Sequence, residues 1–231
     1  MKKYLVLGIV GSMIYALGLA QVPVSKEPRH HKLLDNDHVR LLDVHIPPGD
    51  TSQMHIHATP SVFVMLSTAK AGSQVMSEED RSKYPVQHFD NIYFEGFYKQ
   101  ARIHRVWNSD NIEFHVMDIE LPNRNFIELD PPLHQKGVSF LFEEKPVRAY
   151  RVVLTPGTNI SIAARKADVL LIRLTDDSGA VRARWNAADS RTSDEKIFWK
   201  RGDFLYLTSL TGFNLINQGN SKKEFAFFEL K

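Results

Sequence analysis

Two segments of this chain, 108 residues apart, share one pattern. Residues 39–49 read VRLLDVHIPPG and residues 147–157 read VRAYRVVLTPG, so each begins with Val-Arg and ends with Pro-Gly. Each is followed by an apolar run, over 61–66 in the first half and 168–174 in the second. Self-similarity at this period predicts two copies of one domain rather than a solenoid of many short repeats.

Both halves also end alike. Asn108 precedes a strand-like run over 113–117, and Asn217 precedes one over 224–228. The segments are short, rich in β-branched and aromatic residues, and interrupted by Pro, Gly, Asn and Asp, which predicts an all-β fold with sandwich or barrel topology. The chain of 231 residues accommodates two such domains, and 43% hydrophobic with 24% charged residues is an ordinary globular composition.

The repeat sets the expected domain boundaries. We expect an N-terminal domain over 35–121, a proline-containing linker over 122–145 and a C-terminal domain over 146–231. Residues 68–92 lack clear periodicity and are predicted to form a long surface loop, which is either a lid over a site or a plain solvated insertion.

The N-terminus resembles an export signal. Lys2 and Lys3 precede an uncharged stretch over 4–19, which closes on small residues at Gly18 and Ala20. This pattern predicts a signal peptide over 1–20, cleaved after Ala20, and a periplasmic or secreted protein without a stable membrane anchor. An uncleaved membrane anchor is the alternative, because the apolar stretch is nearly long enough to span a bilayer.

Cysteine and charge exclude several function classes. The chain has no cysteine, which excludes disulfides, thiolate metal sites and a cysteine nucleophile. Lys+Arg total 29 and Asp+Glu total 27, and removal of the two lysines in 1–20 leaves 27 of each. Such a balance gives no general electrostatic reason to bind nucleic acid.

Histidines carry the main chemical signal. His55 and His57 alternate, so on a strand they share one face, roughly 6.6 Å apart. His104 on a neighbouring strand could supply a third imidazole, and three such ligands suit Fe, Mn, Zn, Ni or Cu as a divalent ion. The His-x-His pair alone fits two half-buried, hydrogen-bonded histidines equally well.

The order of these residues resembles a known family. Gly49, five residues, His55, one residue and His57, followed later by His104, three residues and Asn108, is similar to the two signature motifs of the cupin superfamily. The resemblance spans both copies and implies a bicupin, that is, two jelly-roll β-barrels. It also implies one metal inside the N-terminal barrel, held by His55, His57 and His104.

The sequence departs from the cupin pattern in two ways. Ser61 occupies the position where the family usually has a glutamate ligand, and the Pro-x-Gly of the second motif is absent. Cupins similar to cysteine dioxygenase also use three histidines, so metal binding remains compatible with this loss. A less neutralised cation would favour an anionic or chelating oxygen ligand. Ser61 is expected to bond a metal-bound water or simply to pack.

The second copy has lost the motif. Ala163 and Arg165 stand at the positions aligned with His55 and His57, and Phe213 stands at that of His104. The C-terminal barrel is therefore expected to be a structural partner or a surface for homodimer formation. Arg165 is expected to be solvated or, alternatively, to anchor an anion.

Other polar residues have two interpretations each. His115 shares a strand face with apolar residues, which predicts either a satisfied core histidine or a fourth ligand or proton shuttle. Asn108 is expected to brace the turn of the second motif. His30 and His31 lie among charged residues and are expected to be solvated.

The export signal and the cupin resemblance together indicate a secreted metalloprotein that binds a small organic molecule. If it is an enzyme, a metal-dependent oxidoreductase of the dioxygenase type is the favoured chemistry. A non-catalytic binding module for a sugar or small acid is the first alternative. A sugar isomerase or epimerase is the second, and it needs a base, for which His115 and His45 are the candidates.

Overall fold

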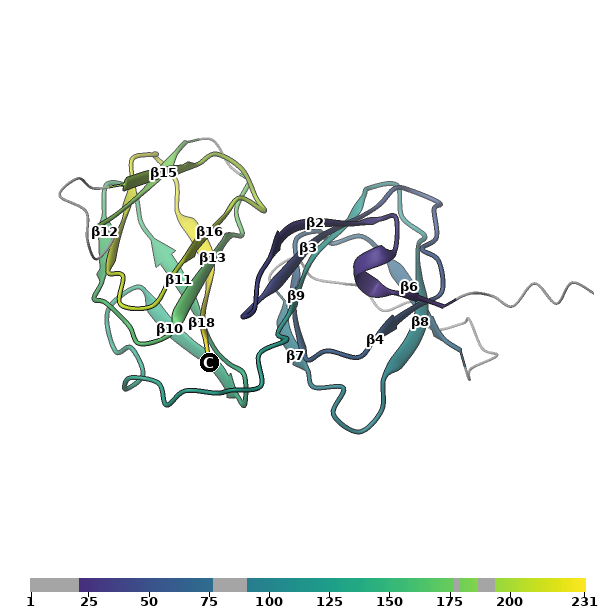
Figure 1. Cartoon of the computed structure of the whole chain (residues 1–231). Coiled ribbons are helices and arrows are strands. Elements are labelled where there is room, and N and C mark those ends of the chain that lie inside the picture. Colours follow the sequence, from purple (N-terminus) through teal and green to yellow (C-terminus); the bar gives the residue numbers. More distant parts are fainter. Residues whose placement is uncertain (1–20, 77–90, 177–178, 187–193) are drawn as a thin grey trace, which may run out of the picture.

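The structure, a computed structural model, describes residues 21–76, 91–176, 179–186 and 194–231. This part of the chain forms two β-barrels that lie side by side (Figure 1), with one short 3-10 turn, η1 (Val24–Lys26). No helix in the described ranges is long and apolar enough to cross a membrane. The predicted signal peptide and residues 77–90 of the predicted loop lie outside the described residues.

The N-terminal barrel consists of two sheets. A five-stranded sheet has the order β2-β3-β9-β5-β7, and a four-stranded sheet has the order β1-β4-β8-β6. Their strands are β1 (Val22–Pro23), β2 (His30–Asp35), β3 (Arg40–Ile46), β4 (His55–His57), β5 (Ser61–Met65), β6 (Ala71–Val75), β7 (Ile92–Glu95), β8 (Arg102–Asn108) and β9 (Phe114–Glu120).

The C-terminal barrel repeats the order of the five-stranded sheet and of three strands of the four-stranded sheet, whose fourth strand lies at the opposite edge. Its five-stranded sheet has the order β10-β11-β18-β13-β16 and its four-stranded sheet the order β12-β17-β14-β15. The strands are β10 (Val138–Glu144), β11 (Val147–Leu154), β12 (Asn159–Ile162), β13 (Asp168–Arg173), β14 (Val181–Trp185), β15 (Asp194–Phe198), β16 (Phe204–Leu207), β17 (Phe213–Asn217) and β18 (Lys223–Leu230). The all-β prediction is confirmed, and the repeat in the sequence corresponds to a shared strand order in all but one strand of each barrel.

The Val-Arg pair of the repeat has a structural role in both copies. Arg40 on β3 lies opposite Glu120 on β9, and its Nη1 donates to the carboxylate at 2.9 Å. Arg148 on β11 lies opposite Glu229 on β18 in the same register, at 3.1 Å. Both glutamates are buried, and a buried carboxylate needs such a charge-assisted partner.

The Pro-Gly pair closes the same turn twice. Gly49 has a φ of 77° and Gly157 a φ of 70°. The N–H of Asp50 donates to the carbonyl of Pro47 at 3.0 Å, and the equivalent bond closes the second turn. Proline followed by a residue with positive φ is the signature of a type II turn, so glycine is required at this position.

Asn108 braces its turn, as predicted. Its Nδ2 donates to the carbonyls of Ile46 at 2.9 Å and Ile112 at 2.8 Å, and its Oδ1 accepts from the N–H of Asp110. Asn217 makes the corresponding bonds in the second copy. One buried amide therefore fixes the loop before the last strand of each barrel.

The strands extend beyond the predicted domain boundaries. β1 and β2 precede residue 35 but pair with β4 and β3, so the N-terminal barrel begins at Val22. The predicted linker over 122–145 includes β10, which pairs with β11, so only 122–137 connects the two barrels. β1, β2 and β10 are edge strands with one neighbour each, and exposed edges favour polar residues that hide the hydrophobic alternation.

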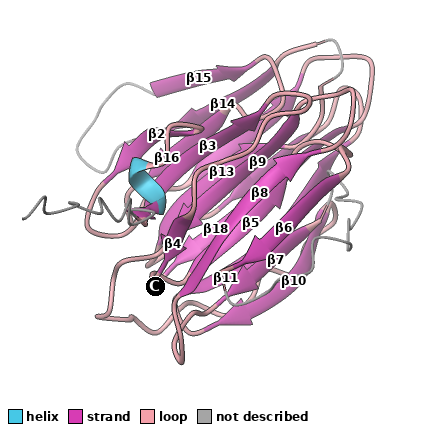
Figure 2. Ribbon diagram, turned by 90° about the vertical axis from the view of Figure 1, so that its right-hand side faces the viewer, coloured by secondary structure: helices cyan, strands magenta, loops and turns pink. Residues whose placement is uncertain are grey.

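The two barrels share a hydrophobic core. One cluster of buried side chains draws Val62, Val64 and Ile119 from the first barrel and Leu170 and Phe228 from the second. The two five-stranded sheets thus pack face to face, and in Figure 2 the strands of both barrels run in nearly the same direction. The C-terminal barrel is therefore a structural partner of the N-terminal one within the same chain.

Candidate metal centre

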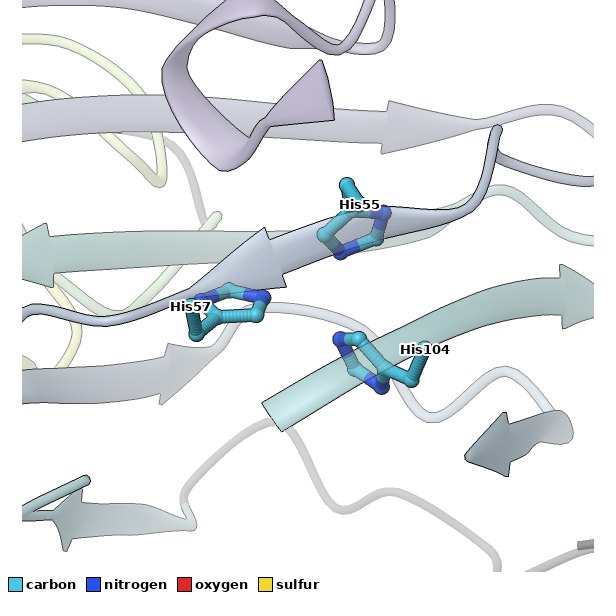
Figure 3. Close-up of side chains that lie close together, drawn as sticks. All are labelled: His55, His57 and His104. Atoms are coloured by element: carbon cyan, nitrogen blue, oxygen red, sulfur yellow. The ribbon is translucent and has the colours of Figure 1, made fainter. Parts of the chain in front are cut away.

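Three histidines converge inside the N-terminal barrel (Figure 3). β4 and β8 pair antiparallel, with His55 directly opposite His104, and His57 lies two residues along β4 on the same face. One ring nitrogen from each histidine lies within 4.8 Å of the other two. Three atoms so spaced all lie within about 2.8 Å of a common point, so small side-chain shifts would bring them to the roughly 2.1 Å of a metal–nitrogen bond.

The outer nitrogens of two of these rings have acceptors. His55 Nδ1 lies 2.8 Å from the backbone carbonyl of Gln53, and His104 Nδ1 lies 2.9 Å from the Ser73 hydroxyl oxygen. A histidine that donates from one nitrogen holds its lone pair on the other, and metal-binding histidines are oriented in this way. His104 Nε2 is buried without a hydrogen-bond partner among the described residues. These contacts leave Nε2 of both rings to face the centre of the triad.

Asp118 faces the outer nitrogen of the third ring, but without a hydrogen bond to it. Its Oδ2 lies 3.5 Å from His57 Nδ1, and neither that nitrogen nor the carboxylate oxygens have a closer partner among the described residues. Burial, together with the negative charge of Glu120, raises the pKa of Asp118 well above its ordinary value. A cation held by the triad would favour the ionised carboxylate. Sequence analysis missed Asp118.

The triad is neutral near pH 7. Burial lowers the pKa of His55 to about 4, and the neighbouring His30 adds to this effect. Burial also holds the pKa values of His57 and His104 well below the usual range. Neutral imidazoles with a free lone pair are what a transition metal requires, so the donor set fits a divalent ion.

Ser61 lies beside Asp118 rather than among the ligand atoms. It is fully buried, and its hydroxyl donates to the backbone carbonyl of Thr59 at 3.1 Å. The hydroxyl also partly opposes the rise in the pKa of Asp118. The position that usually holds a glutamate ligand in cupins is therefore packed and satisfied within the protein.

His115 does not face the triad. Phe114 and Val116 line the barrel interior, so His115, between them on β9, points to the opposite face. There its Nε2 lies 2.7 Å from Asp43 Oδ1 and its ring stacks on His45 at 4.2 Å. The predictions of a fourth ligand or proton shuttle are wrong, and the satisfied histidine is what the structure shows.

Asp43, His45 and His115 form a second cluster of close ligand atoms. The two rings are nearly parallel, with an interplanar angle of 21°, so one ion cannot lie in the plane of both. Instead, His45 bonds Asp43 at 3.0 Å and Glu113 at 2.9 Å. The bond to Asp43 and, after it, that to Glu113 raise the pKa of His45 to about 9, although burial opposes them. The cluster is a charge network on the outside of the barrel.

This network gives a pH-dependent stability. The raised pKa of His45 contributes stability that is present below about pH 6.5 and disappears as the pH rises through about 9. His45→Gln should therefore cost about 1–2 kcal/mol at pH 6, a figure reduced because the ring is 30% exposed, and almost nothing at pH 10. Urea unfolding at the two pH values measures this. The exposed His134→Gln is the control, and an equal loss at both pH values would contradict the assignment.

A cavity of about 440 Å³ adjoins the triad. Most of its wall is apolar, and it is formed by Val44, Ile46, Phe63, Met65, Val106, Phe114 and Val116. The polar wall residues besides the triad and Asp118 include His30, Ser73, Asn91, Tyr93, Glu95 and Arg102. A mostly apolar cavity with a few convergent polar groups is the usual form of a small-molecule site.

His30 belongs to this wall, which overturns the prediction that it is solvated. It is buried, its Nδ1 lies 2.6 Å from Glu27, and its ring contacts that of His55 at 4.9 Å. Burial alone would raise the pKa of Glu27. Hydrogen bonds from His30 and from the N–H groups of Gln53 and Arg29 instead lower it to about 2. His31, by contrast, is exposed as predicted.

Apolar side chains fill the equivalent place in the second barrel. Ile162 lies opposite Phe213 as His55 lies opposite His104, so Ile162 and not Ala163 replaces His55. Phe227 stands where the first barrel has Asp118, and its ring contacts Phe213 at 5.9 Å. All three belong to the core of the C-terminal barrel.

Arg165 is neither solvated nor an anion anchor of a cavity. It is buried, and its Nε donates to Glu229 at 2.5 Å while Nη2 donates to the carbonyl of Pro131. The prediction failed because the partner, Glu229, lies 64 residues away, on the strand next to the one that follows Arg165. The contact ties the connecting segment to the second barrel.

Solved structures with the same fold identify the architecture. AerE from Microcystis aeruginosa matches with a TM-score of 0.58 and 11% identity over 89% of this chain and 98% of its own. Oxalate decarboxylase from Lactobacillus farciminis, in a formate complex, gives 0.59 and 11% over 85% of this chain and 78% of its own.

Oxalate decarboxylase from Bacillus subtilis, studied for its Mn(II) centres, gives a TM-score of 0.60 and 12% identity over 85% of this chain and 70% of its own. These neighbours are cupin proteins, and the likeness shows that this chain has the cupin jelly-roll fold. The sequence matches no protein-family model and no curated protein.

Proposed function

We propose that this protein is a mononuclear metalloprotein that binds one divalent transition metal through Nε2 of His55, His57 and His104. The observation that carries the proposal is the convergence of three buried, neutral imidazoles, two of which are hydrogen-bonded through their outer nitrogens. Fe, Mn, Zn, Ni and Cu all accept such ligands. Mn(II) is the first to test, since the similar oxalate decarboxylase has Mn(II) centres.

The protein groups around the triad define what such a centre would do. A bound metal would supply Lewis acidity or, if redox-active, access to dioxygen. His55, His57 and His104 all come from the β4–β8 wall, so the side toward the cavity stays open for a small organic ligand. Apolar side chains form most of the wall on that side, and the Gln53 carbonyl and Ser73 hold the rings of His55 and His104 in place. We therefore propose an oxidoreductase of the dioxygenase type or a non-catalytic small-molecule binder.

Oxygen uptake separates these two forms. Consumption of oxygen by the metal-loaded protein with phenols, thiols or small organic acids would identify the oxidoreductase, and ligand binding without consumption would identify the binder. The isomerase alternative is left without its two candidate bases, because the side chains of His115 and His45 face away from the cavity.

Metal analysis tests the centre itself. Untagged protein incubated with each of the five divalent ions and then desalted should retain close to one equivalent of at least one of them. His104→Ala should retain less than about a tenth of an equivalent, because two imidazoles bind much more weakly than three. His31→Ala, at an exposed site, is the control. Wild-type retention below about a tenth, unaltered in His55→Ala, would overturn the proposal.

We further propose that the protein is exported to the periplasm or the medium. Two lysines followed by an uncharged stretch and small residues before Gln21 support this. N-terminal sequencing of protein from the exported fraction should begin at or near Gln21. A retained Met1 in the membrane fraction would favour an anchor instead.

A further inference from the structure

We infer that the cavity beside the triad takes a small carboxylate with an apolar body, and that Arg102 anchors the carboxylate group. The inference rests on the proposed function for the position of the metal. Arg102 itself can be tested with or without one. The argument combines the position of Arg102, its lack of an acidic partner, and the apolar wall around it.

Arg102 stands on the same wall as the metal ligands. It lies two residues before His104 on β8, hence on the same face, and directly opposite His57 on β4. It lines the cavity. A ligand in the cavity would thus meet this cation and the metal site together.

Its guanidinium has no acidic partner among the described residues. Its one polar contact there is a long one, from Nη2 to the Ser73 hydroxyl oxygen at 3.4 Å. Three other partly or fully buried arginines, Arg40, Arg148 and Arg165, each bond a buried glutamate instead. A guanidinium at the wall of a cavity, with donors to spare, matches a carboxylate in charge and in planar geometry.

The acidic groups of the wall do not fulfil this role. Glu95 and Asp118 face the same cavity, but neither lies within salt-bridge distance of Arg102 in the described structure. Asp118 instead faces His57. A dication at the neutral triad would add further positive charge, so an anionic ligand balances the cavity better than a neutral one.

The remaining wall selects an apolar body. Phe97 stacks on His57 at 5.5 Å, and Phe63 stacks on Tyr93 at 5.2 Å. Phe97 has a φ of 49°, a backbone conformation that costs a residue with a side chain about 1 kcal/mol. Such strain is typical of ligand sites. Such aromatic walls suit a compact ring or a branched apolar chain.

Benzoate and its neutral analogue benzamide test the inference by calorimetric titration of the protein. The wild-type protein should bind benzoate more tightly than benzamide. Arg102→Gln should weaken benzoate binding about tenfold or more, because a charge-assisted bond is lost, and leave benzamide binding unchanged. Arg102→Lys should lose less, since it keeps the charge. Arg105→Gln is the matched control, because Arg105 lies on the same strand but bonds Gln74 on the outer side.

The outcomes separate this inference from the proposed function. Metal content and thermal unfolding are measured on the same samples, and both should be equal in wild type and Arg102→Gln. Absence of metal would contradict the proposed function, while a benzoate-specific loss in Arg102→Gln without metal would still support the anchor. Equal affinity for benzoate and benzamide, no benzoate binding at millimolar concentration, or unchanged benzoate affinity in Arg102→Gln would overturn it.

Discussion

Replacing Glu229 by alanine will lower the free energy of unfolding by about 3–5 kcal/mol, as measured by urea denaturation. The carboxylate is fully buried and accepts from Arg148 at 3.1 Å, Arg165 at 2.5 Å and the Tyr150 hydroxyl at 3.0 Å. Without it, among the acidic groups of the described residues, Arg148 keeps only the partly exposed Glu143 and Arg165 keeps only the more distant Asp130, so two buried guanidinium groups lose their buried counter-ion. Burying an unpaired charge is far more costly than losing a surface ion pair.

A neighbouring glutamate on the same strand provides the control. Glu224 pairs with Arg151 at 2.9 Å and with Lys222, but both of these partners reach solvent. Glu224→Ala should therefore cost no more than about 1 kcal/mol. Similar losses for the two variants would mean that the buried charges around Glu229 find other partners, which the structure does not predict.

Replacing Phe228 by alanine will also cost about 3–5 kcal/mol, and it will destabilise both barrels together. Phe228 is fully buried in the cluster that joins the two five-stranded sheets. Because this core belongs to both barrels, neither keeps its packing when the other unfolds. Denaturation of the variant, followed by far-UV circular dichroism and by release of a metal bound at the triad, should give one coincident transition at lower urea concentration.

Phe140→Ala is the control for this variant, since Phe140 is 50% exposed and should contribute less than about 1 kcal/mol. Two separate transitions in the wild type, with only the later or only the earlier one shifted in Phe228→Ala, would show that the barrels unfold independently. That result would contradict a shared core.

The sequence was sufficient to predict the barrels and the triad because both depend on short-range patterns. The repeated Pro-Gly turns and the alternation of His55 and His57 can be recognised within a few residues. The opposing position of His104 is non-local, and only the cupin resemblance made it predictable. The brace at Asn108 was predictable for the same reason.

The residues around the triad were harder to predict because β9 is buried on both faces. Its inner face lines the cavity with Phe114 and Val116, and its outer face packs Met117 and Ile119 against the second barrel. A strand buried on both sides loses the polar–apolar alternation that tells inside from outside. The sequence therefore could not decide that Asp118, rather than His115, faces the triad.

His30 and Arg102 were missed for a different reason. Each lies in a segment rich in charged residues, where solvation is the ordinary expectation. Their positions in the cavity wall follow from pairing between distant strands, β2 with β3 and β8 with β4, which local composition does not encode. Strand alternation places Arg102 on the same face as His104. The sequence contains this spacing, but it predicts a cavity-facing arginine only once His104 is known to face the triad.

One barrel contains a cavity and the other is filled by side chains, and this difference affects which substitutions the protein can tolerate. A cavity of about 440 Å³ deprives the first barrel of dispersion contacts, whereas Phe213 and Phe227 supply them in the second. Since the barrels share a core, the filled second barrel also supports the packing of the first. We expect substitutions that reshape the pocket to be tolerated better than substitutions in the shared core. A protein with this arrangement can therefore change its ligand while it keeps its fold.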